Sequence, residues 1–174
     1  MIIVLIMIGG MSWRNNFMEN NNQKAIFAAG CFWGIQKSFD SLDGVLETTV
    51  GYIGGKRENP SYEQVCIGAT GHAEAIEIIF DSEKISYIDL LNHFFEIHDP
   101  TQIDRQGPDV GSQYRSEIFY TDSEQKETAE NLKAKLNSEK FDNHIATAIT
   151  SASEFYPAEE YHQKYLEKNG ANHC

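Results

Sequence analysis

The distribution of apolar residues predicts a regular series of strands and helices from residue 24 onward. The apolar run over 24–29 is typical of a buried strand, and the apolar positions over 31–42 recur at helical spacing. Two more strands are predicted over Val45–Tyr52 and Ala73–Phe80, and a short helical turn near Tyr62 lies between them. The first half of the chain is therefore expected to contain a strand, a helix and two further strands.

A second helix and a fourth strand are expected next. Ser86 and Asp89 have the spacing of a capping box, which predicts a helix that starts there and ends before Pro100. Residues 99–114 form a polar loop, and loops of this length are often functional. A strand over Arg115–Tyr120 completes the order strand, helix, strand, strand, helix, strand. That order is typical of ferredoxin-like α+β domains.

Further elements are expected beyond this βαββαβ core. A charged helix is predicted from Thr121 to about Asn137, followed by a strand over Ile145–Thr150. Pro157 is expected to begin a final helix, because proline is favoured in the first helical turn, and this helix would stop at Asn169-Gly170. The chain is then expected to end in a coil tail.

The composition indicates a single globular domain. The chain has 174 residues, and no repeat or linker divides residues 21–174, whereas residues 1–20 have the character of a disordered leader. The net charge of −12 disfavours nucleic acid as a partner and is compatible with a monomer. The apolar run Met1–Ile8 is too short to span a bilayer and lacks the features of a signal peptide. We therefore expect a cytoplasmic protein without stable membrane association, with export as the alternative.

The three cysteines are Cys31, Cys66 and Cys174, too few and too far apart for a disulfide framework or a zinc knuckle. Such a number is typical of a reducing compartment with one or two reactive thiols. Cys31 lies where the first predicted strand passes into the first predicted helix, and the unpaired amides of a helix start favour a thiolate. Phe32 and Trp33 beside it are expected to wall a small apolar pocket.

Three polar residues are candidates for chemistry next to such a thiol. On a strand, Glu74 shares a face with apolar residues, and a partly desolvated carboxyl group is suited to donate a proton. Tyr62 and Tyr114 lie in polar loops, where each hydroxyl is able to donate a hydrogen bond to an oxygen in a pocket. Each also has an ordinary explanation, as a surface glutamate or as a packing tyrosine.

Three other residues have ordinary explanations of the same kind. Asp109 is most simply a turn residue, and Cys66, between apolar neighbours, is most simply a buried inert thiol. Cys174, on a tail, is either free to reach another thiol or an incidental terminal residue. The residues alone leave these alternatives open.

The segment Gly30-Cys31-Phe32-Trp33-Gly34 resembles the signature of the A-type peptide methionine sulfoxide reductases. Other segments resemble further blocks of that family, in the same order: Gly51–Gly55, Pro60–Tyr62, Gly71–Glu74, His98–Gln102, Asp109 with Gln113–Ser116, and the stretch from Phe155 to Leu166. The resemblance extends from Lys24 to Cys174 and indicates a reductase of this type.

The resemblance implies reduction of methionine S-sulfoxide, in proteins and as the free amino acid. It implies these roles: Cys31 as nucleophile, Glu74 as acid, Tyr62 and Tyr114 as holders of the sulfoxide oxygen, Phe32 and Trp33 as holders of the methyl group, and Asp109 as a residue that orders the loop and water. Cys174 would resolve the sulfenic acid on Cys31 as a disulfide that thioredoxin reduces. No metal or organic cofactor is implied.

Two other functions are alternatives to this one. A cysteine hydrolase or acyltransferase would pair Cys31 with a histidine such as His72, although no Cys-His-Asn spacing supports it. The second alternative is a non-enzymatic interaction domain that has kept the fold but does not catalyse a reaction. Within the reductase interpretation, Cys66 is the alternative to Cys174 as resolving thiol.

Overall fold

The computed structural model describes residues 21–170, so the predicted leader over 1–20 and the tail that carries Cys174 lie outside the described residues. The strands are β1 (Asn22–Ala29), β2 (Val45–Ile53), β3 (Ala73–Asp81), β4 (Arg105–Gln106), β5 (Asp109–Val110), β6 (Ser116–Tyr120), β7 (Ala148–Ser151) and β8 (Tyr156–Pro157). The helices are α1 (Phe32–Asp40), α2 (Tyr62–Cys66), α3 (Tyr87–Glu96), α4 (Ser123–Glu139) and α5 (Tyr165–Lys168), with 3-10 turns η1 (Ser112–Tyr114) and η2 (Glu160–His162).

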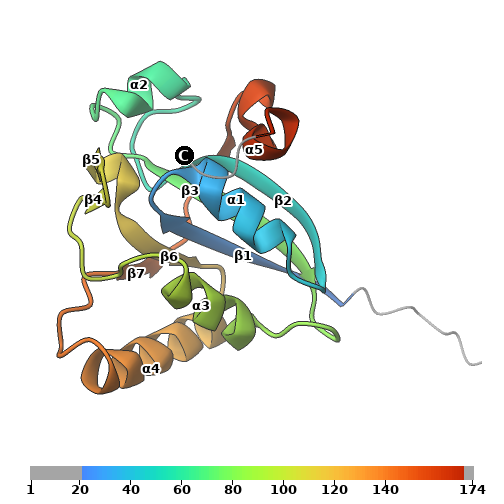
Figure 1. Ribbon diagram of the computed structural model, residues 1–174, viewed down its shortest axis with the longest axis vertical. Helices are drawn as coiled ribbons and strands as arrows, with labels where there is room; N and C mark the ends of the chain where they lie inside the picture. Colours follow the sequence, from blue (N-terminus) through green and yellow to red (C-terminus); the bar gives the residue numbers. More distant parts are fainter. Residues whose placement is uncertain (1–20, 171–174) are drawn as a thin grey trace, which may run out of the picture.

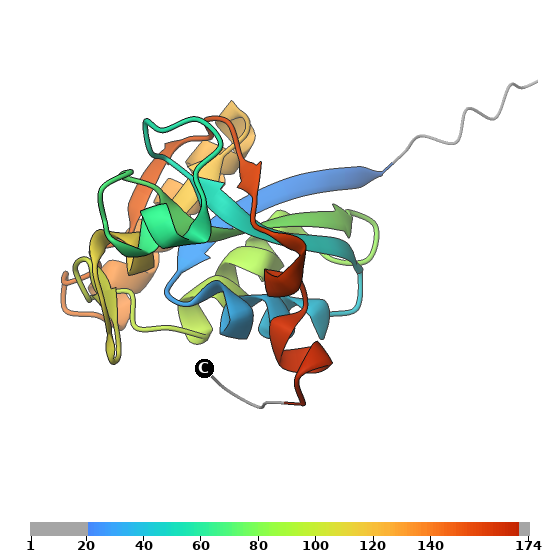
Figure 2. The same ribbon diagram turned by 90° about the horizontal axis from the view of Figure 1, so that it is seen from above.

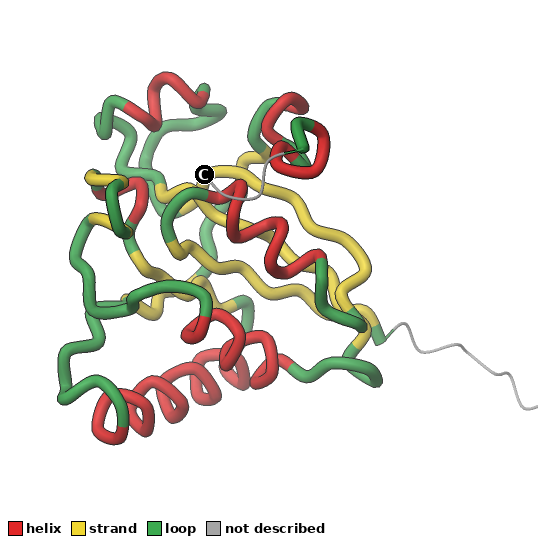
Figure 3. The backbone as a smooth tube through the Cα atoms, in the orientation of Figure 1, coloured by secondary structure: helices red, strands yellow, loops and turns green. Residues whose placement is uncertain are grey.

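A mixed sheet forms the centre of the molecule (Figures 1 and 3). Its strand order is β7-β6-β1-β3-β2-β8. β1 pairs antiparallel with both β3 and β6, and β2 pairs antiparallel with β3. The four strands β6-β1-β3-β2, with α1 and α3 as their connecting helices, are the expected ferredoxin-like βαββαβ core. β7 extends this core parallel to β6, and β8 adds a short edge beside β2.

Alternate residues of each central strand point to opposite faces of the sheet. Ala25, Phe27 and Ala29 of β1 belong to a core that also contains side chains of α1, α3 and α4, whereas Ile26 and Ala28 pack on the other face. Figure 2 shows α1 and α3 together on one side of the sheet. The α+β layering therefore follows from the period-two pattern of the strands and the apolar stripes of the helices.

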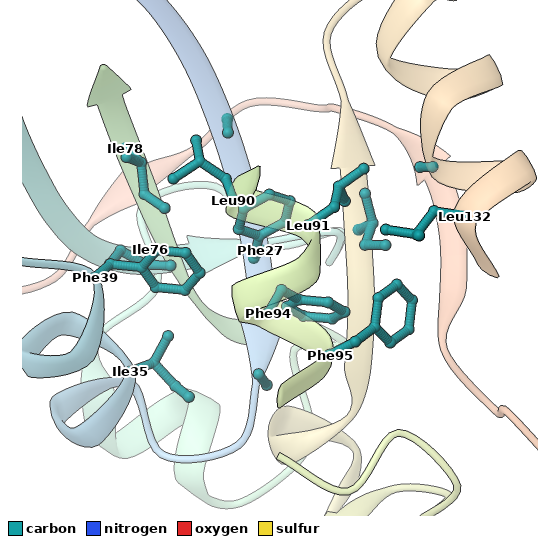
Figure 4. Packing of buried hydrophobic residues seen from close by; sticks show 14 of the residues in the cluster. Phe27, Ile35, Phe39, Ile76, Ile78, Leu90, Leu91, Phe94, Phe95 and Leu132 are labelled. Carbon is teal, nitrogen blue, oxygen red and sulfur yellow. The ribbon is translucent and has the colours of Figure 1, made fainter. Parts of the chain in front are cut away.

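Aromatic rings fill the middle of this helix-side core (Figure 4). The Phe27 ring lies with its centroid 5.6 Å from that of Phe39 in α1 and 5.2 Å from that of Phe94 in α3. All three side chains are fully buried. Because Phe39 fixes α1 in this way against β1, the N-terminal end of α1 has a defined position at the edge of the core.

The predicted start of α3 agrees with the structure. The Ser86 side chain accepts a hydrogen bond from the Asp89 amide, and the Asp89 carboxylate accepts one from the Ser86 amide, which completes the predicted capping box. Ser61 and Gln64 make the same motif at the start of α2. Among residues 21–170, no helix is long and apolar enough to cross a membrane.

The predicted final helix from Pro157 is wrong. Pro157 instead pairs with Gly51 in β8, and the helical part that follows is limited to η2 and the short α5. Proline has no amide hydrogen to donate, so it is tolerated on an edge strand such as β8. The pairing depends on the edge of β2, which lies about a hundred residues earlier in the chain. The long loop over 99–114 contains the β4-β5 hairpin and η1.

Candidate active site

Cys31 lies at the junction that the sequence predicts, as the residue that precedes the first turn of α1. Its side chain is half-buried. Gly30 before it has φ +93°, and a Cβ there would lie 2.7 Å from Cβ of Gln106. A glycine is therefore needed both for the turn out of β1 and for the close approach of Gln106, in the β4-β5 hairpin, to the backbone at Gly30.

Glu74 lies directly beside this helix start. It is 1% exposed and faces the helix side of the sheet, at the beginning of β3 and opposite Tyr52 of β2. The Phe32 amide, the first of α1, donates a hydrogen bond to Glu74 Oε2 at 3.1 Å. Glu74 therefore lies on the predicted face of β3. Its carboxyl group is held at the helix start by the amide of Phe32, the residue that follows Cys31.

Tyr62 enters the site from α2. Its ring stacks on Phe32, with centroids 6.4 Å apart. Its hydroxyl forms a hydrogen bond with Cys66, which is half-buried at the other end of α2 rather than fully buried as expected. Burial raises the pKa of Cys66, and the hydrogen bond from Tyr62 only partly opposes this, so Cys66 is stabilised as a thiol.

Tyr114 enters the site from η1. The Gln113 amide group donates to the Cys66 carbonyl at 3.1 Å, which joins η1 to α2. Burial raises the pKa of Tyr114, and electrostatic interactions with Glu74, Cys66 and Asp109 raise it further. Burial raises the pKa of Tyr62 as well. Both hydroxyls therefore remain protonated donors at neutral pH, and Asp109 of β5 lies within electrostatic range of Tyr114.

Phe32 and Trp33 form an aromatic wall beside Cys31. Phe32 is 1% exposed and Trp33 is half-buried. The Trp33 indole stacks on Tyr165 with ring centroids 3.9 Å apart and 13° between the planes. Its Nε1–H donates to Nδ1 of His162 at 3.1 Å. The expected apolar wall is therefore present, and it is larger than the two residues predicted from the sequence.

Sequence reasoning gave no role to three residues that contact this wall or the tyrosines: Glu159, His162 and Tyr165. They lie about a hundred residues or more from their partners, so no local spacing marks them. The one signal in the sequence was that all three lie in the last stretch that resembles the reductase family. Cys174 lies outside the described residues, and its position is not part of this geometry.

His72 is not arranged as a base for Cys31. Its Nδ1 accepts from the Gly55 amide at 3.1 Å, and its Nε2 lies 2.8 Å from the Arg57 carbonyl. Both ring nitrogens are thus used to hold the loop after β2. Within residues 21–170, no group of three or more His, Cys, Asp or Glu side chains is arranged to hold a metal ion.

The site therefore combines a thiol at a helix start, a buried carboxyl group, two phenol donors and an aromatic wall. Two phenol hydroxyls and a carboxyl group are suited to bind and protonate an oxygen. An aromatic wall is suited to a small apolar group attached to the same centre. The arrangement fits nucleophilic attack by the thiol on an atom that carries both an oxygen and a small apolar group.

Comparison with known proteins identifies the chain. Residues 23–174 match the family model described as peptide methionine sulfoxide reductase. The peptide methionine sulfoxide reductase MsrA of Methanothermobacter thermautotrophicus is 55% identical over 153 residues, which cover 87% of this chain and 90% of that protein. The crystal structure of reduced Mxr1 from Saccharomyces cerevisiae superposes with a TM-score of 0.84 at 36% identity, covering 88% of this chain and 89% of that chain. Mxr1 in complex with Trx2 gives a TM-score of 0.62 at 26% identity, with coverages of 84% and 86%. The chain therefore belongs to the peptide methionine sulfoxide reductase family.

Proposed function

We propose that Cys31 is the nucleophile with which this methionine sulfoxide reductase attacks the S epimer of its substrate. The observation that carries the proposal is the position of Glu74, which accepts the Phe32 amide at 3.1 Å. This contact holds a buried carboxyl group at the helix start that carries the thiol. The helix start favours a thiolate, and the neighbouring carboxyl group supplies an acid.

The reduction step uses these groups together. Tyr62 and Tyr114 donate hydrogen bonds to the sulfoxide oxygen, and Glu74 provides the proton that makes the sulfur electrophilic. The Cys31 sulfur attacks, the substrate S–O bond breaks, and the oxygen ends on Cys31 as a sulfenic acid. Two electrons pass from the Cys31 sulfur to the substrate, which leaves as methionine.

The aromatic wall orients the substrate for this step. Phe32 and Trp33 receive the methyl group, while the hydroxyls of Tyr62 and Tyr114 receive the oxygen. Because the two substituents of sulfur have separate sites, only one epimer presents its sulfur to Cys31. Asp109 contributes by ordering the loop that carries Tyr114.

Recycling requires a second thiol. Cys174 condenses with the sulfenic acid to give a Cys31–Cys174 disulfide and water, and the dithiol of thioredoxin then reduces that disulfide. The structure of the related Mxr1 in complex with Trx2 supports thioredoxin as the reductant. We further propose that residues 21–174 act as one monomeric domain in the cytoplasm, on oxidised proteins and on free methionine sulfoxide.

The test is reduction of dabsylated methionine S-sulfoxide with dithiothreitol as reductant. Cys31→Ser should abolish methionine formation, whereas the matched control Cys66→Ser should retain it. Cys174→Ser should complete one turnover and then fail to use thioredoxin. Turnover by Cys31→Ser would disprove the nucleophile, and thioredoxin-dependent turnover by Cys174→Ser would identify Cys66 as the resolving thiol.

A further inference from the structure

The C-terminal turn over residues 159–163 lies against both halves of the proposed substrate site. It consists of η2 and its flanking residues Glu159 and Gln163. The Gln163 side chain bonds both the amide and the carbonyl of Val50 in β2, each at 2.9 Å. The turn is therefore anchored to the sheet, independently of the residues that it contacts in the site.

Glu159 links Tyr62 to the core of the sheet. Its Oε1 accepts from the Tyr62 amide at 3.0 Å, and its Oε2 accepts from the hydroxyl of the fully buried Tyr52 at 2.9 Å. Burial alone would raise the pKa of Glu159, but these donors outweigh it and lower the pKa, so the carboxylate stays charged. A helix of five residues has little stability of its own, so α2 depends on such contacts for its position.

His162 holds the indole of Trp33. Stacking on Tyr165 sets the plane of the indole but makes no directional contact with its Nε1–H. The hydrogen bond from Trp33 Nε1 to His162 Nδ1, at 3.1 Å, supplies that contact and favours one side-chain rotamer. An accepting Nδ1 requires the neutral tautomer with its hydrogen on Nε2, and burial lowers the pKa of His162 in favour of the neutral ring.

The burial of His162 is difficult to explain by packing alone. The side chain is 2% exposed, and its Nε2 has no hydrogen-bond partner within residues 21–170. It lies among aromatic rings, with the Tyr62 centroid 4.2 Å away and the Phe32 centroid 5.4 Å away. A buried polar group without a partner is costly, so an apolar ring would be the more stable choice here. A phenylalanine at position 162 would fill the same space but could not accept the hydrogen bond from Trp33.

We infer that Glu159 and His162 are positioning residues that separately fix the two ends of the substrate pocket, the oxygen end at Tyr62 and the methyl end at Trp33. The inference rests on the roles proposed for Tyr62 and Trp33. It predicts different effects on activity when Glu159 or His162 is replaced. Displacement of Tyr62 slows the step that forms methionine, whereas rotation of Trp33 weakens binding and recognition of the methyl group.

The experiment compares variants that remove the hydrogen-bond acceptor at Glu159 or His162 with variants that keep an acceptor at the same position. Glu159→Ala should lower the single-turnover rate by about 10- to 100-fold, since misplacement of a catalytic group by about 1 Å has effects of this size. Glu159→Gln still accepts the Tyr62 amide and should recover most of that rate. His162→Phe should raise KM and lower the preference for methyl over ethyl sulfoxide by about tenfold, whereas His162→Asn, with an acceptor near Nδ1, should restore it.

Glu160→Ala and His144→Phe are matched controls on exposed residues and should behave like wild type. A wild-type rate in Glu159→Ala, or an unchanged methyl preference in His162→Phe, would overturn the inference. Equal losses of both properties in both variants, together with lower melting temperatures, would show a merely structural role and would also overturn it. Tyr62→Phe and Trp33→Phe are measured in parallel. If these two behave like wild type, the proposed roles of Tyr62 and Trp33 are themselves wrong.

Discussion

Replacement of Glu74 by glutamine tests the proposed acid with little change in shape. The amide oxygen of Glu74→Gln can still accept the Phe32 amide, which lies 3.1 Å from the carboxylate, so the start of α1 should be preserved. The side chain is 1% exposed, so bulk water cannot readily replace the lost proton donor. A general acid contributes about 10²- to 10⁴-fold in rate, and we expect a loss of this size in the methionine-forming step. That corresponds to roughly 3–5 kcal/mol of transition-state stabilisation.

The assay is single-turnover formation of methionine, followed by rapid quench, with the free energy of unfolding measured in urea alongside. Stability of Glu74→Gln should change by about 1 kcal/mol or less. Glu77→Gln is a matched control, because Glu77 lies on the opposite face of β3 and forms a surface ion pair with Lys24 at 2.8 Å. It should retain the wild-type rate. The reasoning is refuted if Glu74→Gln forms methionine as fast as wild type, or if Glu77→Gln is equally slow.

Two further predictions concern stability. Burial lowers the pKa of His98 to about 4 from its usual 6.5, so between these pH values the unfolded chain binds a proton that the folded chain does not. The free energy of unfolding should therefore fall by up to about 3 kcal/mol as the pH drops through this range. Urea titrations at several pH values should show that His98→Gln lacks this part of the decrease. Parallel curves of stability against pH for wild type and His98→Gln would contradict the prediction. At Gly51, a Cβ would lie 2.3 Å from the Tyr156 carbonyl oxygen, so Gly51→Ala should separate β8 from β2. We expect a loss of about 1–3 kcal/mol, seen as a lower melting temperature, and an unchanged melting temperature would disprove the close contact.

The reductase core was predictable because its signals are local. The residues around Cys31 form a strand, a glycine turn and a helix whose apolar spacing is visible within a few residues. The face of Glu74 follows from the alternation of side chains on β3. The capping box at Ser86 was likewise correct, because it depends on residues three apart.

The segment from Pro157 onward was predicted less well. Pro157 favoured a helix start, but the segment instead pairs with the edge of β2 and forms β8. Local propensity is weak, and pairing with a distant edge overrides it. The surroundings of Cys66 also involve a distant residue, since the Gln113 side chain donates a hydrogen bond to its carbonyl from another part of the chain.

The sequence by itself determined the order of the core elements and the thiol at a helix start, because both depend on local periodicity. The residue types expected for attack on a sulfoxide were indicated by the resemblance of its motifs to the reductase family. Only the tertiary structure decided what holds these groups in place. Trp33 meets His162 and Tyr62 meets Glu159 across about a hundred residues or more. Such contacts form when strands and loops distant in the chain pack together, and no local pattern encodes their geometry.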